Sequence, residues 1–381
     1  MNADIVPARV APGHAVSGNG RSRNAPGRLH TKNIALTIPE RIAIEEVRSD
    51  PAYDPSIEQY LKDVDRQLVP YMREAVALVP DVETLRAGVA AQIHTGGKRI
   101  RAALCVVCCE LFGADYTRAL AYAAAIEHIQ NLTLIHDDIA DGDTERRSRP
   151  ALWKQYGVPH AINIGDAFIP LGSLSILRAP YPDAVKLKLL DIVAQYGLEM
   201  TVGQSIDINL RTRETFSVAD YITCTRMKTG AFLAMAVVGG GLIGGGSPAH
   251  LELLRRYARL AGVAFQIKDD SLDLTGGKGR QIGSDIVEGK ITVHAVYAMN
   301  NSTPEERVRL RRILAKSRRS TQRDEVEWVL SLYRKVGAAA FAERTATGMI
   351  EAAAQHLLLL PESPQRERLI QLSRYLSRRV R

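Results

Sequence analysis

The sequence predicts an all-α protein, built as one large helical domain from about residue 55 to residue 381. Apolar residues recur at the spacing of one helix face, for example at Ile57, Leu61, Val64 and Leu68. Convincing strands with alternating apolar and polar residues are missing. Aromatic residues make up only 6% of the chain while Ala and Leu are abundant, and this composition favours helix over sheet.

Helix-start signals recur within this domain. Thr303 is followed by Pro304 and by Glu306, which combines an N-cap, a Pro at the first helical position and a capping-box acid. Ser363 and Pro364 open the last predicted helix in the same way. No internal repeat is found. We therefore expect a series of helices joined by short loops.

Residues 1–50 differ from this domain in composition. They are rich in Gly, Pro, Ser, Asn and Arg and lack apolar periodicity, so we expect a disordered tail. An organellar transit peptide is also Arg-rich and poor in acids, but the Pro and Gly residues argue against an amphipathic helix. No basic segment followed by a continuous apolar run marks a signal peptide. A flexible tail is therefore the favoured interpretation.

Cysteine usage indicates a reducing, cytoplasmic environment. Three of the four cysteines crowd one predicted helix, which excludes a disulfide framework. Cys105 and Cys108 have the spacing of a metal or redox pair, but no second ligand pair follows at zinc spacing. We expect all of them to be buried thiols. The four residues are Cys105, Cys108, Cys109 and Cys224.

One uncharged stretch, from Thr229 to Ala249, is long enough to span a bilayer. It is rich in Gly and ends at Ser247 and Pro248, which form a helix-start signature. We interpret it as a buried core helix followed by a loop, so no transmembrane segment is expected.

A group of acids ends a predicted helix that begins near Ala119. Its lead-in, residues 126–136, is mostly apolar, and acids at the end of a buried helix are unfavourable unless their charges are compensated. The group consists of Asp137, Asp138 and Asp141. Asp137 and Asp141 are four residues apart and share one helix face, where a bound cation would relieve their repulsion.

The same pattern recurs 132 residues later, after the apolar stretch 261–267. These acids are Asp269, Asp270 and Asp273. One such motif alone would often be a solvated helix end, but the helix dipole disfavours acids there, and two cases weaken that interpretation. Two facing carboxylate clusters suit a polyanion held through several metal ions, and hard oxygen ligands favour Mg²⁺. A departing diphosphate needs such charge neutralisation.

Basic residues alternate with the acids along the chain. Gly96 and Gly97 precede Lys98, Arg99 and Arg101 at a helix start, where backbone N–H groups and positive charge can form an anion site. Further cations are Arg146, Arg147, Lys228 and Lys290. A single charge pair is usually a solvated surface feature. Together these residues predict metal ions for one phosphate group and direct cation contacts for a second.

The charge balance supports a phosphorylated small molecule as the substrate. The formal net charge is +8, of which the first 39 residues contribute +4 through five basic residues against one Asp. A basic chain can bind nucleic acid, an anionic membrane or a phosphorylated substrate. No Cys/His finger, basic zipper or RNP motif is found, so no nucleic-acid partner is expected.

These residues together resemble the trans-isoprenyl diphosphate synthase family, which includes farnesyl and geranylgeranyl diphosphate synthases. The similarity runs from about residue 60 to the C-terminus. It covers, in the family's order, the Gly-Gly-Lys-Arg-Ile-Arg segment, both DDxxD motifs, the Arg-Arg pair, Gly165-Asp166, Gly203-Gln204 with Asp207, Lys228-Thr229, Phe265-Gln266, and Gly283-Ser284-Asp285 with Gly289-Lys290. So many motifs in one order are highly specific.

The resemblance implies a helical bundle of the isoprenoid synthase type, with a central cavity between the helices that carry the two DDxxD motifs. It implies a homodimer and a head-to-tail, Mg²⁺-assisted condensation of isopentenyl diphosphate with an allylic diphosphate. Three Mg²⁺ ions would be held by Asp137, Asp141 and Asp269, with Asp138, Asp270 and Asp273 as further ligands or supports. The allylic diphosphate would be bound by Arg146, Lys228 and Lys290, and isopentenyl diphosphate by Lys98, Arg101, Gln130 and Arg147. Thr229 and Gln266 would stabilise the carbocation.

Some positions depart from the family pattern. Ala102 replaces a usual Pro, and Ser148 replaces a Gly after the Arg-Arg pair. Arg280 stands where a Lys often contacts diphosphate, in a loop from Gly276 that is short. None of these changes removes a proposed metal ligand, but the last one leaves the active-site flap unassigned.

Product length is expected to follow from the wall upstream of Asp137. Family members that stop at fifteen carbons often carry an aromatic residue four or five positions upstream, where this chain has Thr133 and Leu132. No aromatic side chain closes the pocket at these two positions, and geranylgeranyl diphosphate is therefore the expected product. Farnesyl or longer polyprenyl products are the alternatives. Ile129 and Cys109 are candidates for a deeper floor.

Two other functions are compatible with parts of the pattern. A class I terpene cyclase, a lyase, shares the helical fold and the first motif but needs neither a second DDxxD nor an isopentenyl site. A non-catalytic subunit of a heteromeric synthase commonly lacks Asp ligands, whereas all six are intact here. Both alternatives are therefore disfavoured.

Overall fold

The computed structural model describes residues 56–147, 149–276 and 281–377, which belong to one compact unit. The predicted tail of residues 1–50 lies outside the described residues, as do Ser148 and residues 277–280, including Arg280. The extents predicted for the tail and for the helical domain remain predictions.

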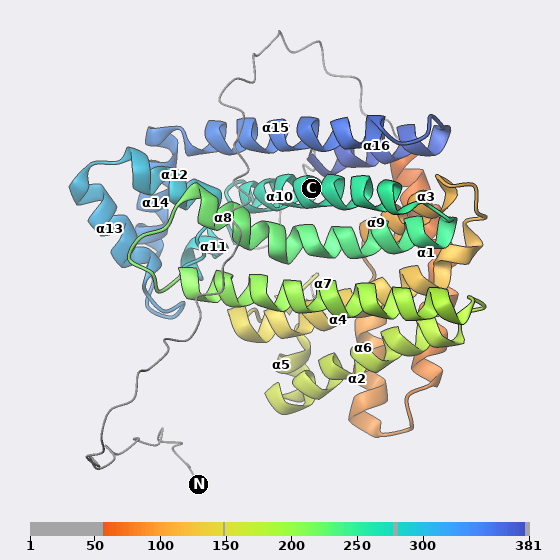
Figure 1. Ribbon diagram of the computed structural model, residues 1–381. Coiled ribbons are helices and arrows are strands. Elements are labelled where there is room, and N and C mark those ends of the chain that lie inside the picture. The colour runs from red at the N-terminus through yellow and green to blue at the C-terminus, as the bar shows by residue number, and fades with distance from the viewer. Residues whose placement is uncertain (1–55, 148, 277–280, 378–381) are drawn as a thin grey trace, which may run out of the picture. The chain divides into compact units, whose positions relative to one another are not determined.

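The described residues are predominantly helical, so the all-α prediction is confirmed (Figure 1). The elements are α1 (Ser56–Ala77), α2 (Glu83–His94), α3 (Ile100–Glu110), α4 (Thr117–Asp141), β1 (Glu145–Arg146), β2 (Arg149–Pro150), α5 (Leu152–Tyr156), α6 (Val158–Arg178), α7 (Asp183–Leu210), α8 (Val218–Thr225), the π-helical turn η1 (Arg226–Gly230), α9 (Ala231–Gly244), α10 (Pro248–Asp273), α11 (Ser284–Val287), α12 (Val293–Asn301), α13 (Pro304–Leu314), α14 (Arg323–Val336), α15 (Ala338–Leu358) and α16 (Pro364–Ser377). The two short strands form an antiparallel hairpin.

The long helices pack in layers around α9 and α10. Helix α10 packs against α9 and α15, and α9 also packs against α3 and α7. Figure 1 shows α15, α10, α9 and α7 running side by side, with α4 and α6 behind and below α7. This arrangement brings the ends of α4 and α10, which lie far apart in sequence, into the same part of the molecule.

Helix α9 confirms the predicted core helix. It is strongly apolar, and nearly every one of its residues is buried. Two stretches are long and apolar enough to cross a membrane by length and composition alone, Val158–Arg178 and Val218–Gly244. The second stretch contains α9, and 78% of its apolar window is buried inside the protein, as in a core helix. The corresponding value for the first stretch, α6, is 39%.

Local predictions about caps and thiols are also confirmed. The Thr303 hydroxyl accepts a hydrogen bond from the Glu306 backbone at 3.3 Å, and the Glu306 carboxylate accepts one from the Thr303 backbone at 3.1 Å, which is the capping box expected from the sequence.

All four cysteines are buried and unbridged. Burial raises the pKa of the Cys105 and Cys108 thiols well above the usual value, which makes them inert.

The π-helical turn η1 presents Lys228 and Thr229 where two helices approach it very closely. A Cβ atom on Gly203 of α7 would lie 2.6 Å from the Lys228 backbone nitrogen, and one on Gly262 of α10 would lie 2.5 Å from the Cα of Gly230. Only glycine fits at these two contacts. Single π-turns within helices occur frequently at functional sites.

We predict that Gly203→Ala destabilises the protein because its methyl group would collide with the η1 backbone. The expected loss in the free energy of unfolding is about 1–3 kcal/mol, measured by urea denaturation. Gly197→Ala, on the same helix, is the matched control because no atom lies within 4 Å of its Cβ position. Its added helix propensity is worth up to about 1 kcal/mol. Equal stabilities of the two variants would contradict this account of the contact.

Candidate active site

The central cavity has a volume of about 1390 Å³ and is lined by residues of both aspartate motifs and by the predicted cations. Among its lining residues are Lys98, Arg101, Gln130, Leu132, Thr133, Asp137, Asp141, Arg146, Arg147, Lys228, Thr229, Gln266, Asp269 and Lys290. Three of the predicted residues, Asp138, Asp270 and Asp273, are not among them. The volume exceeds the range of about 300–1,000 Å³ typical of small-molecule pockets, so there is room for two substrates.

The first motif divides its acids between two environments. Asp137 and Asp141 face the cavity from the last turn of α4. Gln204 donates a hydrogen bond to Asp137 at 3.2 Å, and Arg211 donates one to Asp141 at 3.0 Å. Burial raises the pKa of Asp137, while the nearby Lys228 opposes this shift. Ionised Asp137 therefore depends on positive charge beside it.

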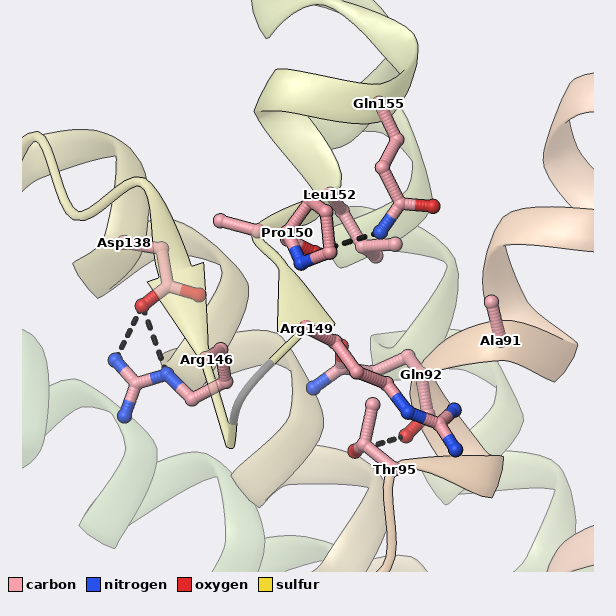
Figure 2. A pocket seen from close by; sticks show the side chains of 10 residues that line it. Ala91, Gln92, Thr95, Asp138, Arg146, Arg149, Pro150, Leu152 and Gln155 are labelled. Atoms are coloured by element: carbon pink, nitrogen blue, oxygen red, sulfur yellow. Dashed lines mark hydrogen bonds and ion pairs between the residues drawn. The ribbon is translucent and has the colours of Figure 1, made fainter. Parts of the chain in front are cut away.

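Asp138 is not among the residues that line the central cavity and is only 4% exposed. Figure 2 shows its carboxylate meeting the guanidinium group of Arg146, whose Nε donates a hydrogen bond at 2.9 Å. The pair lies beside a separate cavity of about 180 Å³, which Gln92, Thr95 and Arg149 also line. Arg146 reaches the central cavity as well, so Asp138 orients a cation at its edge.

The second motif is also divided, but with one acid at the cavity and two buried. Asp269 lines the cavity, whereas Asp270 and Asp273 are each 1% exposed. Asp270 accepts hydrogen bonds from Tyr221 at 2.8 Å, Gln266 at 2.9 Å and Lys290 at 2.9 Å. Buried carboxylates need such partners.

Asp273 holds the segment that follows the motif. It accepts hydrogen bonds from the Ser284 hydroxyl at 2.5 Å and from the Asp285 backbone at 3.1 Å. The short helix α11 is thereby attached to the end of α10. Asp285 in turn lies 3.7 Å from Lys290, so this contact also supports a cation of the cavity.

Cations from η1 and from the segment after α11 remain charged in this setting. Burial opposes the charge of Lys228, but Asp137 and Asp207, at 3.9 and 3.5 Å, raise its pKa. Burial likewise opposes the charge of Lys290, yet Asp270 and Asp285 hold its pKa well above the usual value. Both lysines therefore present positive charge to the cavity at neutral pH.

Thr229 and Gln266 form one hydrogen-bonded chain with Asp270. The Thr229 hydroxyl donates to the Gln266 side-chain oxygen at 2.8 Å, and the Gln266 amide donates to Asp270 at 2.9 Å. Because Asp270 is buried and fixed by other donors, it orients the Gln266 amide. The carbonyl dipole of that amide lies at the cavity wall.

The three cations of the Gly-Gly-Lys-Arg-Ile-Arg segment all belong to the cavity lining but have different partners. Lys98 and Arg101 line the cavity, and the Arg101 guanidinium lies 4.3 Å from the ring centroid of Phe232. Arg99 instead extends into the core, where it donates to Asp65 at 2.8 Å and to Glu127 at 2.9 Å. Its backbone is left-handed, with φ 49°. Arg99 thus ties the loop to α1 and α4.

Arg147 completes this end of the cavity. It donates a hydrogen bond to the carbonyl of Gly96, and its guanidinium lies against Gly97, where a Cβ would be 3.1 Å away. The glycines predicted as part of an anion site therefore also make room for this cation. Arg147 lies with Lys98 and Arg101 on the cavity wall.

The carboxylates fit Mg²⁺ as shared ligands rather than as a preformed cage. Within the described residues, no three His, Cys, Asp or Glu side chains converge closely enough to hold a metal by themselves. Mg²⁺ characteristically uses one or two carboxylates together with water and substrate phosphates, so Asp137, Asp141 and Asp269 are suitable donors. Without metal, Lys228 and Arg211 balance the charge of Asp137 and Asp141.

Several charged residues of the site were not predicted from the sequence. They are Asp143, Arg211, Glu288 and Arg318, all of which line the cavity. Arg211 follows Asp207 by four residues on α7, and that spacing is a signal that could have identified it. Arg318 lies far from its partners in sequence and carries no local signal.

The chain matches the family model described as Polyprenyl synthetase over residues 82–333, which is more than half of its length. The chain belongs to this family. It is 33% identical over 311 residues to the short chain isoprenyl diphosphate synthase of Methanothermobacter thermautotrophicus, a match that covers 81% of this chain and 94% of that protein.

Solved structures of this family agree with the fold. The geranylgeranyl pyrophosphate synthetase of Pyrococcus horikoshii is similar with a TM-score of 0.78 and 29% identity, over 85% of this chain and 99% of that one. The polyprenyl synthase of Caulobacter crescentus, solved with calcium and isoprenyl diphosphate, gives a TM-score of 0.76 and 28% identity, over 87% and 100% of the two chains. This polyprenyl synthase family member is accordingly a prenyltransferase, and the family generally uses Mg²⁺.

We predict that Glu288 makes stability fall between pH 6 and pH 8 in the absence of Mg²⁺. Burial and the charges of Asp141, Asp285 and Asp143 raise its pKa to about 8. In this range, Glu288 is protonated in the folded state and ionised in the unfolded state, so unfolding releases a proton and stability decreases as pH rises. Relative to Glu288→Gln, the wild type should lose about 2 kcal/mol. Urea unfolding at both pH values measures this, and parallel pH dependences of the two proteins would contradict it.

Proposed function

We propose that this chain is a geranylgeranyl diphosphate synthase that condenses isopentenyl diphosphate head to tail with an allylic diphosphate. The observation that carries the proposal is the single cavity in which both aspartate motifs face two sets of cations. The family membership, the short chain synthase from Methanothermobacter thermautotrophicus and the geranylgeranyl pyrophosphate synthetase from Pyrococcus horikoshii support it.

The two sets of cations divide the two diphosphates between them. Lys228 and Lys290 lie with Arg146 near the aspartates and would bind the allylic diphosphate, the group that leaves. The cations near the α3 start would bind the diphosphate that stays, on isopentenyl diphosphate. They are Lys98, Arg101 and Arg147, with Gln130 beside them.

The reaction follows from this placement. Bound Mg²⁺, held by Asp137, Asp141 and Asp269 and in our proposal three ions, would neutralise the charge that builds on the departing diphosphate. The allylic C–O bond breaks and its electron pair leaves with the diphosphate. The isopentenyl double bond attacks the allylic cation, and a proton is then lost to the departed diphosphate.

The chain's own dipoles protect the cation. The Gln266 amide and the Thr229 hydroxyl form part of the cavity wall, and fixed dipoles aimed at a developing charge stabilise it without reorganisation. Phe232, Phe265 and Ile129 supply apolar surface around the same space. Such surface excludes water that would otherwise quench the cation.

The product length is proposed from the wall upstream of Asp137. Leu132 and Thr133 line the cavity and are half-buried, and neither is aromatic. Ile129, one turn further from Asp137, also lines it, whereas Cys109 is buried and is not among the lining residues. The wall continues along α7 with Val193 and Met200. The cavity is not closed by an aromatic residue at Leu132 or Thr133, and apolar surface continues beyond them. This supports a product longer than fifteen carbons.

We also propose that the enzyme is a homodimer in the cytoplasm. Helices α6 and α7 expose large apolar side chains, which a second copy would cover: Val158, Ile162, Ile169, Leu177, Leu187, Leu198, Val202 and Ile208. Four buried free thiols support a reducing compartment. Sedimentation equilibrium of the purified protein would measure the assembly, and a monomer mass would contradict the dimer.

The activity is tested by incubation with Mg²⁺, labelled isopentenyl diphosphate and each of three allylic primers of five, ten and fifteen carbons. We predict label incorporation and a twenty-carbon end product by chromatography. Asp137→Ala should reduce turnover at least 100-fold, equivalent to about 2.7 kcal/mol of barrier, while the fold remains intact. Asp191→Ala, at an exposed position of α7, is the control. No incorporation by the wild type with any primer would contradict the synthase proposal.

For the wall, we predict that Leu132→Phe shortens the end product because an aromatic ring would fill space that the growing tail occupies. The measurement is the chain length of the product with a ten-carbon primer, at matched total turnover. Leu358→Phe, on the exposed surface of α15, is the control and should leave the product unchanged. If Leu132→Phe still yields the wild-type length, another helix sets the limit.

A further inference from the structure

Arg318 connects the two acidic halves of the active site, although no sequence motif marks it. It lies in the loop between α13 and α14, and its side chain reaches the central cavity. Its Nη1 donates hydrogen bonds to the main-chain carbonyl of Asp141, to Asp143 at 3.0 Å and to Glu288 at 3.5 Å. These acceptors come from two separate segments, the end of α4 and the loop after α11.

The burial of its partners separates this contact from an ordinary surface ion pair. The Asp143 and Glu288 side chains are 4% and 3% exposed, whereas the Arg318 side chain is 36% exposed. The buried Asp143 carboxylate needs a compensating partner, and removal of that partner leaves an unfavourable buried charge. The carbonyl of Asp141 also lies at the negative end of the α4 dipole, where a cation is favourable.

The loop that carries Arg318 is fixed to the second acidic half by independent packing. Gly289 has φ +70°, and a Cβ at this position would lie 2.4 Å from the carbonyl oxygen of Leu314, at the end of α13. The segment that holds Glu288 and Lys290 therefore packs directly against the start of the Arg318 loop. Lys290 in turn binds Asp270 of the second motif at 2.9 Å.

A second contact also links α13 to the neighbourhood of the first motif. Arg311 of α13 donates a hydrogen bond to the main-chain carbonyl of Arg211 at 3.1 Å, and Arg211 binds Asp141 at 3.0 Å. Helix α13 and the loop after it thus contact the end of the first motif through two arginines. Arg318 contacts Asp141 directly, and Arg311 is linked to it through Arg211.

We infer that Arg318 is a positioning residue that holds the Asp141 turn of the first motif at a fixed separation from the second motif, so that both can share one metal-bound diphosphate. This inference rests on the proposed function of the cavity. It assigns to the α13–α14 loop a role in Mg²⁺ and diphosphate affinity. Arg318 acts through Asp141 and Glu288, and it does not contact the reacting carbon atoms.

The test measures binding without turnover. Calorimetric titration of Mg²⁺ in the presence of inorganic diphosphate should give an affinity at least fivefold weaker for Arg318→Met than for the wild type. Arg319→Met, the adjacent exposed residue, is the matched control and should remain within twofold of the wild type. In steady-state assays, the KM for the allylic diphosphate should rise while the KM for isopentenyl diphosphate changes less than twofold.

Arg318→Lys provides a second variant in case the Met variant does not fold. It keeps the charge but replaces the weakly hydrated guanidinium with a compact, strongly hydrated ammonium on a different stem, so an intermediate loss of affinity, at least twofold, is expected. Unchanged Mg²⁺ and diphosphate affinity in either folded variant would overturn the inference, even if the melting temperature falls. A different result would contradict the proposed function. In that case the wild type would bind Mg²⁺ and diphosphate normally but would transfer no prenyl group.

Discussion

The site depends on one constraint, which is that the charges of six aspartates at the ends of two largely buried helices must be compensated. Acids at helix C-termini are opposed by the helix dipole and by burial, so each needs a partner. The protein supplies these partners in two ways. Asp138, Asp270 and Asp273 are paired inside the protein with side-chain and backbone donors, whereas Asp137, Asp141 and Asp269 are left at the cavity, where cations and, in our proposal, metal ions share them.

This division explains why the two motifs carry more acids than could contact one substrate group. One buried member of each motif orients a cation that reaches the cavity: Arg146 next to Asp138, and Lys290 next to Asp270. In our proposal, the segments that present carboxylates to the metal ions therefore also hold the cations that bind the substrate. Close packing at Gly203 and Gly262 adds Lys228 to this set by holding the η1 turn between α7 and α10.

Much of the site followed from the sequence because its signals are local. The capping box at Thr303, the helix ends at Asp141 and Asp273, and the cavity-facing pair Asp137 and Asp141 depend only on helix geometry and short spacing. The side-chain directions of other residues depend on tertiary contacts. Asp273 is four positions from Asp269, yet it is drawn to Ser284, and Arg99 extends into the core because of its left-handed backbone. Arg318 meets Asp143 across 175 residues, a contact that no periodicity encodes.

The cavity also separates chemistry from product length. Charged groups line the cavity at the two aspartate motifs, at η1 and at the α3 start, while α4 and α7 also contribute apolar residues such as Ile129, Val193 and Met200. In our proposal, the charged residues bind the diphosphates, so a growing tail extends along the apolar walls. A side chain on α4 can therefore change how far the tail extends without moving a carboxylate, provided that its size and not its polarity changes. The same rigid helix that presents Asp137 also carries Leu132, and this fixes the distance from the reacting end at which a tail would meet the wall.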